Sequence, residues 1–523
     1  MAYKLTYSTM FDPPPEMHSR FEAALHEVRA GLGRKHALHI AGKDVETGAA
    51  KDKLSPIDRH WLLGSFAQAT GEHVEQSMRA ASDAFPRWRS TPPAERIRLL
   101  RRVAQLIEER VYHIAAAVSL EVGKNRMEAL GEVQETADFF NVYCDSFEAQ
   151  DGFDHVLPND PLPNVVSRNR SVMKPYGVWV VINPFNFPFA LAGGPVAAAL
   201  VTGNTVVLKG ASETPWSGRL LADCLRDAGL PPGVFNYLMG PGAAIGAALV
   251  NHPQTCGVTF TGSYETGMGI LRKFAGGRYP KPCIAEMGGK NACVVTANAD
   301  LDTAAAGIVR SAFGMGGQKC SALSRLYVEA PVADALIQKL LQRMQAIGVG
   351  DPARQENWLG PVVSEGAQRK FSGYVARLRE GGARLLFGGE VLSTGDLARG
   401  FYAAPTLAEA PLDLPLWREE MFLPILMLHR VKDLDTGIRQ ANDSDLGLTA
   451  GVYGSKADVA EFLERIEAGV TYSNRALGAT TGAWPGYQPF GGWKGSGNTG
   501  KAIASFYYLA QYLREQSQTV VES

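Results

Sequence analysis

The spacing of apolar side chains changes along the chain, from helical steps in the first third to continuous β-branched runs in the middle. After Thr91-Pro92-Pro93, apolar residues from Ile97 to Ile114 recur every three or four positions, which predicts an amphipathic helix with a proline start. A further helix is predicted from 124 to about 143. Its acidic residues lie on or near one side, and we expect this face to be solvated, as such faces usually are: Glu128, Glu132, Glu135 and Asp138.

The middle of the chain alternates strand patterns with helical patterns. Runs typical of fully buried parallel strands lie at 177–182, 205–208, 234–238 and 257–260, and helical stretches lie at 194–201 and 217–228. This alternation predicts a doubly wound α/β sheet. After the third strand, the glycines at 240, 242 and 246 have the spacing GxGxxxG instead of the dinucleotide fingerprint GxGxxG, so a tight turn is the alternative to a cofactor site.

Prolines and glycines set off the outer segments. Residues 1–60 mix prolines, charges and short apolar pieces, and we interpret them as a wrapping arm with a strand around a turn at 39–45. The sequence 151–164 breaks every helix and predicts a hairpin. The end of the chain, 507–521, is strand-like and is a candidate for pairing with another subunit.

A second α/β region begins near Ile284 and contains a predicted strand at 325–328 and a predicted helix at 332–344. No proline-rich or glycine-rich and serine-rich linker separates it from the first region. We therefore expect two tightly packed domains with an active site between them.

Composition limits the partners of the chain. With 523 residues the chain is too long to fold around one ordinary hydrophobic core, and this length is typical of a large enzyme. The net charge is −1 and no long basic block occurs, which argues against nucleic acid or an anionic membrane surface and favours small ligands. The six cysteines have no CxxC spacing, which is typical of reduced thiols. Without a signal-like start or a run of 18 apolar residues, we expect a soluble cytoplasmic protein.

Cys320 is the candidate nucleophile. It follows Gly316-Gly317-Gln318-Lys319, so backbone can approach it closely and a cation precedes it, although most free cysteines are simply buried in a core. A thiolate that attacks an aldehyde produces an oxyanion, for which the amide of Asn186 is a candidate donor, with a turn-forming role as the alternative. Hydrolysis of the resulting thioester needs a general base, and Glu286 stands beside small residues that admit water.

Seven motifs occur along the chain in the order typical of one family. They are NPFNFP at 183–188, VVLK at 206–209, FTGS at 260–263, EMGGKN at 286–291, GQKC at 317–320, EEMFLP at 419–424 and PFGGWKGSG at 489–497. On these motifs, the chain resembles the aldehyde dehydrogenase superfamily over nearly its whole length. The resemblance implies a Rossmann-like NAD-binding domain (1–148 and 168–284), an α/β catalytic domain (285–476), a small β flap for oligomerisation (149–167 and 498–523) and a substrate-anchor loop (477–497).

The resemblance also implies roles for single residues. Cys320 would be the nucleophile, Glu286 the base for deacylation, and Asn186 with the Cys320 backbone N–H the oxyanion hole. The residues expected to bind the cofactor are Ile182, Pro184, Phe185, Lys209, Ser212, Gly242, Gly246, Thr261, Gly262, Ser263, Gly288, Glu420 and Phe422. No metal is expected, and the expected partners are a small aldehyde and further copies of the chain, as a dimer or higher oligomer.

Some positions depart from the family's pattern. Gly210 follows Lys209 where proline is usual, and Leu423 stands where glycine is usual, so the local loops are expected to differ. Ser212 stands where many NAD-selective relatives carry a glutamate that binds the ribose 2′-hydroxyl. Serine removes a carboxylate that would repel a 2′-phosphate, so NAD is the expected cofactor and NADP is possible.

The anchor loop indicates the substrate. A Thr-Gly-Ala turn at 481–483 together with the Ser321 hydroxyl resembles the branch of the superfamily that oxidises L-glutamate γ-semialdehyde to L-glutamate in proline breakdown. That resemblance implies six substrate-binding residues: Glu135, Phe187, Ser321, Gly482, Ala483 and Phe490. Three alternatives are an enzyme for another aldehyde, a CoA-acylating relative, which has less use for Glu286, and a non-catalytic protein on the same scaffold.

Overall fold

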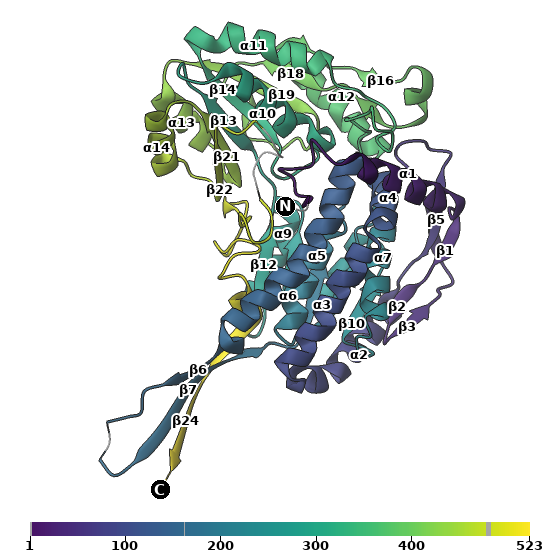
Figure 1. Cartoon of the computed structure of the whole chain (residues 1–523), viewed down its shortest axis with the longest axis vertical. Coiled ribbons are helices and arrows are strands. Elements are labelled where there is room, and N and C mark those ends of the chain that lie inside the picture. The colour runs from purple at the N-terminus through teal and green to yellow at the C-terminus, as the bar shows by residue number, and fades with distance from the viewer. Residues whose placement is uncertain (1–2, 162, 477–482, 523) are drawn as a thin grey trace.

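The computed structural model of the chain describes residues 3–161, 163–476 and 483–522. These residues form two α/β bodies side by side, and a narrow arm of three strands projects from one of them (Figure 1). The space where the two bodies meet contains the functional residues described below.

The first body is built on a seven-stranded sheet with the order β12-β11-β8-β9-β10-β2-β3. The five parallel strands are β8 (Val178–Ile182), β9 (Thr205–Lys209), β10 (Phe235–Leu238), β11 (Thr255–Thr261) and β12 (Cys283–Glu286). The hairpin of β2 (Leu38–Ile40) and β3 (Lys43–Val45) is added antiparallel at one edge. The predicted strands and the hairpin at 39–45 are therefore confirmed, and β12 carries the first sheet to Glu286, beyond the expected start of the second region near Ile284.

Helices cover this sheet, and α5 is the longest of the first body. They are α1 (Pro15–Ala30), α2 (Gly71–Ser90), α3 (Pro93–Glu109), α4 (Val111–Val122), α5 (Arg126–Ala149), α6 (Ala190–Val201), α7 (Pro215–Asp227), α8 (Ala247–Asn251) and α9 (Tyr264–Ala275). In Figure 1 the helices α3, α5 and α6 lie next to one another across the body. Helix α1 was not predicted within the wrapping arm.

The single helix predicted from Ile97 to Ile114 is wrong. The structure has two helices, because α3 ends at Glu109 and α4 begins at Val111, with Arg110 between them. The apolar spacing continues across the break since Ile97, Leu100, Val103, Ile107 and Ile114 all belong to the same buried cluster. Periodicity reports which side chains are buried but not that the axis changes direction.

The second body is built on a seven-stranded sheet with the order β15-β18-β19-β14-β13-β21-β22. Its strands are β13 (Asn291–Val295), β14 (Leu323–Glu329), β15 (Arg384–Phe387), β18 (Thr406–Glu409), β19 (Ile425–Val431), β21 (Thr449–Tyr453) and β22 (Val470–Ser473). Its helices are α10 (Leu301–Phe313), α11 (Ala330–Gln345), α12 (Glu365–Glu380), α13 (Leu434–Asn442) and α14 (Lys456–Arg465). Along β13, Ala292 and Val294 join one apolar cluster whereas Cys293 and Val295 join another, as the alternation of a strand requires.

The projecting arm is a sheet of three antiparallel strands, β6 (Asp154–Leu157), β7 (Val166–Pro175) and β24 (Leu513–Glu522). The hairpin predicted at 151–164 is confirmed, but its second strand lies beyond that range, because β6 pairs with residues 169–172 of β7. The C-terminal strand pairs with β7 of its own chain, from Leu513 opposite Pro175 to Glu522 opposite Val166. Pairing of this strand with another subunit stays a prediction.

One small three-stranded sheet and two pairs of short strands complete the structure. They are β1 (Arg34–His36), β4 (Ala50–Leu54) and β5 (Leu62–Ala67) in one sheet, β16 (Val391–Leu392) with β17 (Tyr402–Ala403), and β20 (Leu446–Gly447) with β23 (Trp493–Lys494). The last pair is placed where the chain returns from the second body to the first, because the residues after β23 contact Glu286 and Met287.

Candidate active site

The loop that presents Cys320 connects α10 to β14 in the second body. Met315, Gly316 and Gly317 have positive φ angles of 53°, 62° and 67°, which lets the chain reverse within one 3-10 turn. A Cβ on Gly317 would lie 2.3 Å from the Leu423 carbonyl oxygen, so this position requires glycine. The amide of Asn291 donates to the carbonyl oxygen of Cys320 at 2.7 Å. The turn and this hydrogen bond fix the backbone that carries the thiol.

The surroundings of Cys320 do not favour a thiolate. Burial, together with the carboxylates of Glu420 and Glu286, raises the pKa of the Cys320 thiol to about 12, although backbone N–H groups act in the opposite direction. The ammonium of Lys319 lies 3.9 Å from the Glu128 carboxylate, so the preceding cation faces a carboxylate on α5. The thiol therefore needs a proton acceptor before it attacks a carbonyl group.

Glu286 is the last residue of β12, at the junction of the two bodies. Burial raises the pKa of its carboxyl to about 8, and a hydrogen bond from the Gly492 backbone lowers it. Its Oε2 atom is buried and has no hydrogen-bond partner within the described ranges. A buried carboxyl with an unused oxygen and a pKa near neutrality is suited to take a proton from water or from a thiol.

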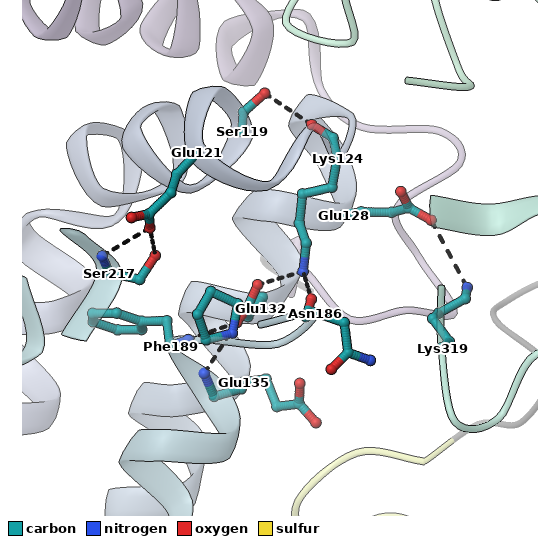
Figure 2. A network of polar contacts seen from close by, with 12 residues as sticks. Ser119, Glu121, Lys124, Glu128, Glu132, Glu135, Asn186, Phe189, Ser217 and Lys319 are labelled. Atoms are coloured by element: carbon teal, nitrogen blue, oxygen red, sulfur yellow. Dashed lines mark hydrogen bonds and ion pairs between the residues drawn. The ribbon is translucent and has the colours of Figure 1, made fainter. Parts of the chain in front are cut away.

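Asn186 lies in the loop between β8 and α6, and a buried ion pair fixes this loop (Figure 2). Lys124 bonds to Glu132, and its ammonium donates to the Asn186 carbonyl oxygen at 2.8 Å. Glu132 Oε1 accepts from the backbone N–H groups of Phe189 (2.8 Å) and Ala190 (3.2 Å). The pair thus holds the middle and the C-terminal end of the loop and fixes the backbone that carries the Asn186 amide, a positioning function that the sequence did not indicate.

The acidic face of α5 is not solvated, so that expectation is wrong. The exposed fraction is 5% for Glu128, 0% for Glu132 and 8% for Asp138, and Glu135 lines an internal cavity. Three of the four carboxylates are buried with a partner: Lys319 for Glu128, Lys124 for Glu132, and the Trp484 indole and Lys4 ammonium for Asp138. The half-buried Glu135 accepts from the Tyr7 hydroxyl. The sequence did contain a sign of this burial, because small and apolar residues separate the acids: Ala129, Leu130, Gly131 and Val133.

One cavity collects five of the six predicted substrate-binding residues. Cys320, Ser321, Glu135, Phe187, Ala483 and Phe490 line it together. Gly482 lies outside the described residues. Burial raises the pKa of the Glu135 carboxyl to about 8, while a hydrogen bond from the Tyr7 hydroxyl lowers it. The lining also includes Tyr7 and Met10, which sequence reasoning missed because they belong to the supposed wrapping arm and no local pattern marks them. Trp484 lines it too; it lies in the predicted substrate-anchor loop but was not among the predicted substrate-binding residues. We refer to this space as the substrate cavity.

A second cavity lies at the other side of the site, at the carboxyl ends of β9 and β10. Ser212 and Gly242 line it, and Glu213, which sequence reasoning missed, lines it too. The Ser212 hydroxyl donates to the Gly240 carbonyl oxygen at 3.1 Å. Gly246 lies in the same turn as Gly242 but is not part of the lining. We refer to this space as the cofactor cavity.

Lys209 and Ser263 bring polar groups to the edge of the first sheet. Lys209 ends β9 and is 4% exposed, and burial lowers the pKa of its ammonium to about 8. A Cβ on Gly242 would lie 3.8 Å from the Lys209 ammonium, so the two are neighbours. Ser263 follows β11 and caps α9, where its hydroxyl accepts from Thr266 N. Thr261 and Gly262 join this strand to the helix, whose N-terminus attracts anions.

Glu420 and Phe422 connect the cofactor side to the nucleophile. Glu420 accepts from Gly289 N at 2.8 Å, and a Cβ on Gly288 would collide with its carboxylate at 2.2 Å. The ring of Phe422 stands edge-on to that of Phe185, with 5.8 Å between centroids. Ile182, Pro184 and Phe185 follow in sequence at the end of β8. The buried ammonium of Lys209, the N-terminus of α9 and the buried carboxylate of Glu420 match the phosphate and ribose groups of a dinucleotide, so these residues fit NAD.

Two other kinds of site were sought in the described part of the chain. No group of three or more His, Cys, Asp or Glu side chains there is arranged to hold a metal ion. Among the helices of that same part, none has the length and apolar character needed to cross a membrane.

Comparison with known proteins gives consistent matches. Residues 45–517 match the description "Aldehyde dehydrogenase family". The chain is 39% identical over 509 residues to 1-pyrroline-5-carboxylate dehydrogenase of Geobacillus thermodenitrificans, covering 96% of each protein, and 37% identical to 1-pyrroline-5-carboxylate dehydrogenase 2 of Bacillus subtilis, again covering 96% of each. A crystal structure of 1-pyrroline-5-carboxylate dehydrogenase from Thermus with bound NAD superposes with a TM-score of 0.91 at 34% identity over 100% of both chains.

Proposed function

Because this chain belongs to the aldehyde dehydrogenase family, we propose that it oxidises L-glutamate γ-semialdehyde, the open form of 1-pyrroline-5-carboxylate, to L-glutamate with NAD. The observation that carries the proposal is the substrate cavity. There the thiol of Cys320 shares one lining with Ser321 and Ala483, which suit a carboxylate, and with Glu135, which suits an ammonium group. The relatives and the solved structure named 1-pyrroline-5-carboxylate dehydrogenase support the same substrate.

In the first half of the proposed reaction, the Cys320 thiol loses its proton to solvent and the sulfur attacks the aldehyde carbon. The carbonyl oxygen becomes an oxyanion, which accepts hydrogen bonds from the Asn186 amide and the Cys320 backbone N–H. When bound, NAD supplies the hydride acceptor. Loss of hydride from the carbon restores the carbonyl group and leaves a glutamyl thioester on Cys320.

In the second half, water hydrolyses the thioester. Glu286 accepts a proton from the water molecule as the water oxygen attacks the thioester carbon. The C–S bond then breaks, L-glutamate leaves, and the Cys320 thiolate takes the proton back from Glu286, which restores both groups. Among the described residues Glu286 Oε2 has no hydrogen-bond partner, and this supports the role because it leaves room for a hydrogen bond from water. A CoA-acylating enzyme has no need of this arrangement.

The division of the chain into four functional parts is also a proposal. Residues 1–148 and 168–284 would bind the cofactor, 285–476 would carry the nucleophile, 477–497 would anchor the substrate, and 149–167 with 498–523 would form the oligomerisation flap. Exposed apolar side chains on the projecting arm, Val156, Val520 and Val521, support association with a further copy through this flap. We place the enzyme in the cytoplasm, since its cysteines are free thiols.

Steady-state kinetics with paired substrates tests the proposed activity. With NAD, kcat/KM for 1-pyrroline-5-carboxylate is expected to exceed that for pentanal, an unsubstituted aldehyde of equal length, by at least about a hundredfold, because pentanal leaves the polar groups of the substrate cavity unpaired. The product is expected to be L-glutamate with or without added CoA. Equal efficiencies for both aldehydes, or formation of a glutamyl-CoA, would refute the assignment.

A further inference from the structure

The N-terminal segment, residues 4–10, is built into the wall of the substrate cavity. Tyr7 and Met10 line the cavity itself. The segment is held on both sides: the Lys4 ammonium lies 3.1 Å from the Asp138 carboxylate on α5, and the Ser8 hydroxyl accepts from Arg475 at 2.7 Å. The segment therefore bridges the first body and the loop that follows β22.

The surface of α5 is shaped to receive the Tyr7 side chain. A Cβ on Gly131 would lie 3.0 Å from Cε1 of Tyr7, so the absence of a side chain at this position makes room for the ring. One helical turn later, Glu135 Oε2 accepts a hydrogen bond from the Tyr7 hydroxyl at 2.6 Å. Gly131 and Glu135 are four residues apart and lie on one face of the helix. This face thus receives both the ring and the hydroxyl of the same residue.

Aromatic side chains fix the ring of Tyr7 from the remaining directions. It stands edge-on to Phe187, with 6.3 Å between centroids, and to Trp484, with 5.1 Å between centroids. The Trp484 indole in turn donates to Asp138 at 2.7 Å. Burial and the neighbouring carboxylates hold the pKa of the Tyr7 hydroxyl well above its ordinary value, so it stays protonated and donates. Its donor can reach only one of the two Glu135 oxygens.

The other oxygen of Glu135 is available to a ligand. Within the described ranges, Glu135 Oε1 has no hydrogen-bond partner, and the side chain lines the same cavity as Cys320. A carboxylate that is held at one oxygen has a fixed orientation. It therefore binds a ligand whose donor reaches the other oxygen more selectively than a ligand without that donor. A carboxylate without this support can rotate away from the cavity.

We propose that Tyr7 is a specificity-determining residue: its hydroxyl holds Glu135 so that the second carboxylate oxygen receives the α-ammonium group of the substrate. This inference rests on the proposed function and extends it to the N-terminal segment. Tyr7 acts on recognition of the amino group and has no part in the chemistry at Cys320. A purely structural role, in which Tyr7 only closes the cavity, predicts equal effects on every aldehyde.

The test compares Tyr7→Phe with the wild-type enzyme on two substrates that differ by one group. The substrates are L-glutamate γ-semialdehyde and 5-oxopentanoate, which has the same chain and carboxylate but no amino group, each at one fixed pH. Tyr7→Phe keeps the ring and its contacts but removes the hydroxyl. KM for the semialdehyde is expected to rise about tenfold with little change in kcat, while KM for 5-oxopentanoate changes less than twofold.

Two further variants control for damage to the segment. Tyr3→Phe removes the other tyrosine hydroxyl of this part of the chain, which donates to the Thr9 carbonyl outside the cavity, and it should match the wild type on both substrates. Trp484→Phe removes the hydrogen bond to Asp138 and should weaken the binding of both substrates to a similar extent. An equal loss on both substrates in Tyr7→Phe, or unchanged KM values, would overturn the inference.

Product inhibition provides a second readout that does not depend on turnover of the variant with the semialdehyde. L-Glutamate is expected to inhibit Tyr7→Phe about tenfold more weakly than the wild type, while inhibition by glutarate stays the same. If the wild-type enzyme prefers the semialdehyde over 5-oxopentanoate and Tyr7→Phe retains that preference, the inference about Tyr7 fails but the proposed function stands. If the wild-type enzyme has no preference, the proposed function and the inference fail together.

Discussion

The substrate side and the cofactor side of the site are built in different ways. On the cofactor side, Lys209 and Ser212 stand at or just after the end of β9 and Ser263 just after the end of β11, two parallel strands that flank β8 in one sheet. On the substrate side, the lining comes from the N-terminal segment, α5, the loop after β8, the Cys320 loop and the segment 483–490. The sheet thus places these three polar residues of the cofactor side, whereas the substrate cavity depends on contacts between side chains of separate segments.

The two sides also differ in how their buried charges are compensated. Burial lowers the pKa of the Lys209 ammonium and no carboxylate opposes this shift, as expected of a group whose counter-charge is a ligand. On the substrate side, Lys124 pairs with Glu132 and Lys319 faces Glu128 inside the protein. Because paired buried charges depend on one another, substitutions there should be coupled, whereas substitutions on the cofactor side should act independently.

The largest expected effect separates chemistry from cofactor binding. Cys320→Ala should lower kcat by about 10⁴-fold or more, because no other side chain replaces the sulfur, while NAD affinity stays within about twofold of the wild type. Steady-state rates and titration with NAD measure the two quantities. Cys256→Ala, which removes another partly accessible thiol, is the control and should retain full activity. A large loss of NAD affinity in Cys320→Ala would show that the two sides are not independent.

The next effect tests the coupling on the substrate side. Lys124→Met should lower the free energy of unfolding by about 3–5 kcal/mol, because it leaves the Glu132 carboxylate buried without its cation. Denaturant unfolding measures this loss. The control is Arg369→Met, which removes one partner of the exposed Arg369–Glu365 pair and should cost less than about 0.5 kcal/mol.

A double variant separates stability from positioning. In Lys124→Met with Glu132→Gln, the buried charge is gone and the glutamine oxygen can still accept from Phe189 N, so most of the stability should return. The Asn186 carbonyl oxygen still lacks its donor, and kcat should stay about tenfold below the wild type. Full recovery of kcat would show that Lys124 serves stability alone.

The pH dependence of thioester hydrolysis reports the environment of Glu286. Burial raises the pKa of this carboxyl to about 8, and only its ionised form accepts a proton from water. The rate of hydrolysis in single turnovers should therefore fall about tenfold for each pH unit below 8 and become constant above it. A rate that is independent of pH between 6 and 8 would exclude Glu286 as the base.

The smallest effect concerns the cofactor side. The wild-type enzyme should use NADP as well as NAD, since Ser212 carries no charge to repel a 2′-phosphate. Ser212→Glu should lower kcat/KM for NADP by about tenfold and change the value for NAD less than threefold. Equal effects on both cofactors would show that this side chain does not face the ribose.

The difference between the two sides explains what the sequence could predict. The strands of the first sheet and most of the polar residues at their ends follow from local hydrophobic runs and motifs, and the resemblance to the family added their roles. Cys320, Glu286 and five substrate residues lie where the two bodies meet, as expected. The break at Arg110 was missed because both helices bury their apolar residues in one core.

The substrate side was less predictable because its contacts join residues far apart in the sequence. Tyr7 meets Glu135 across 128 positions, and Trp484 meets Asp138 across 346. The acids of α5 were assigned to water because a charge pattern on a helix does not reveal whether cations such as Lys124 and Lys319 face it in the folded chain. Burial of a charge depends on tertiary partners, which local periodicity does not report.

Trapping of the covalent intermediate tests the central claim most directly. Glu286→Gln, mixed rapidly with NAD and 1-pyrroline-5-carboxylate, should release a burst of about one NADH per subunit and then turn over slowly, since the thioester forms but is not hydrolysed. Mass spectrometry of the quenched protein should find one glutamyl group on Cys320. Absence of both the burst and the glutamyl group, or modification of a different residue, would contradict the account.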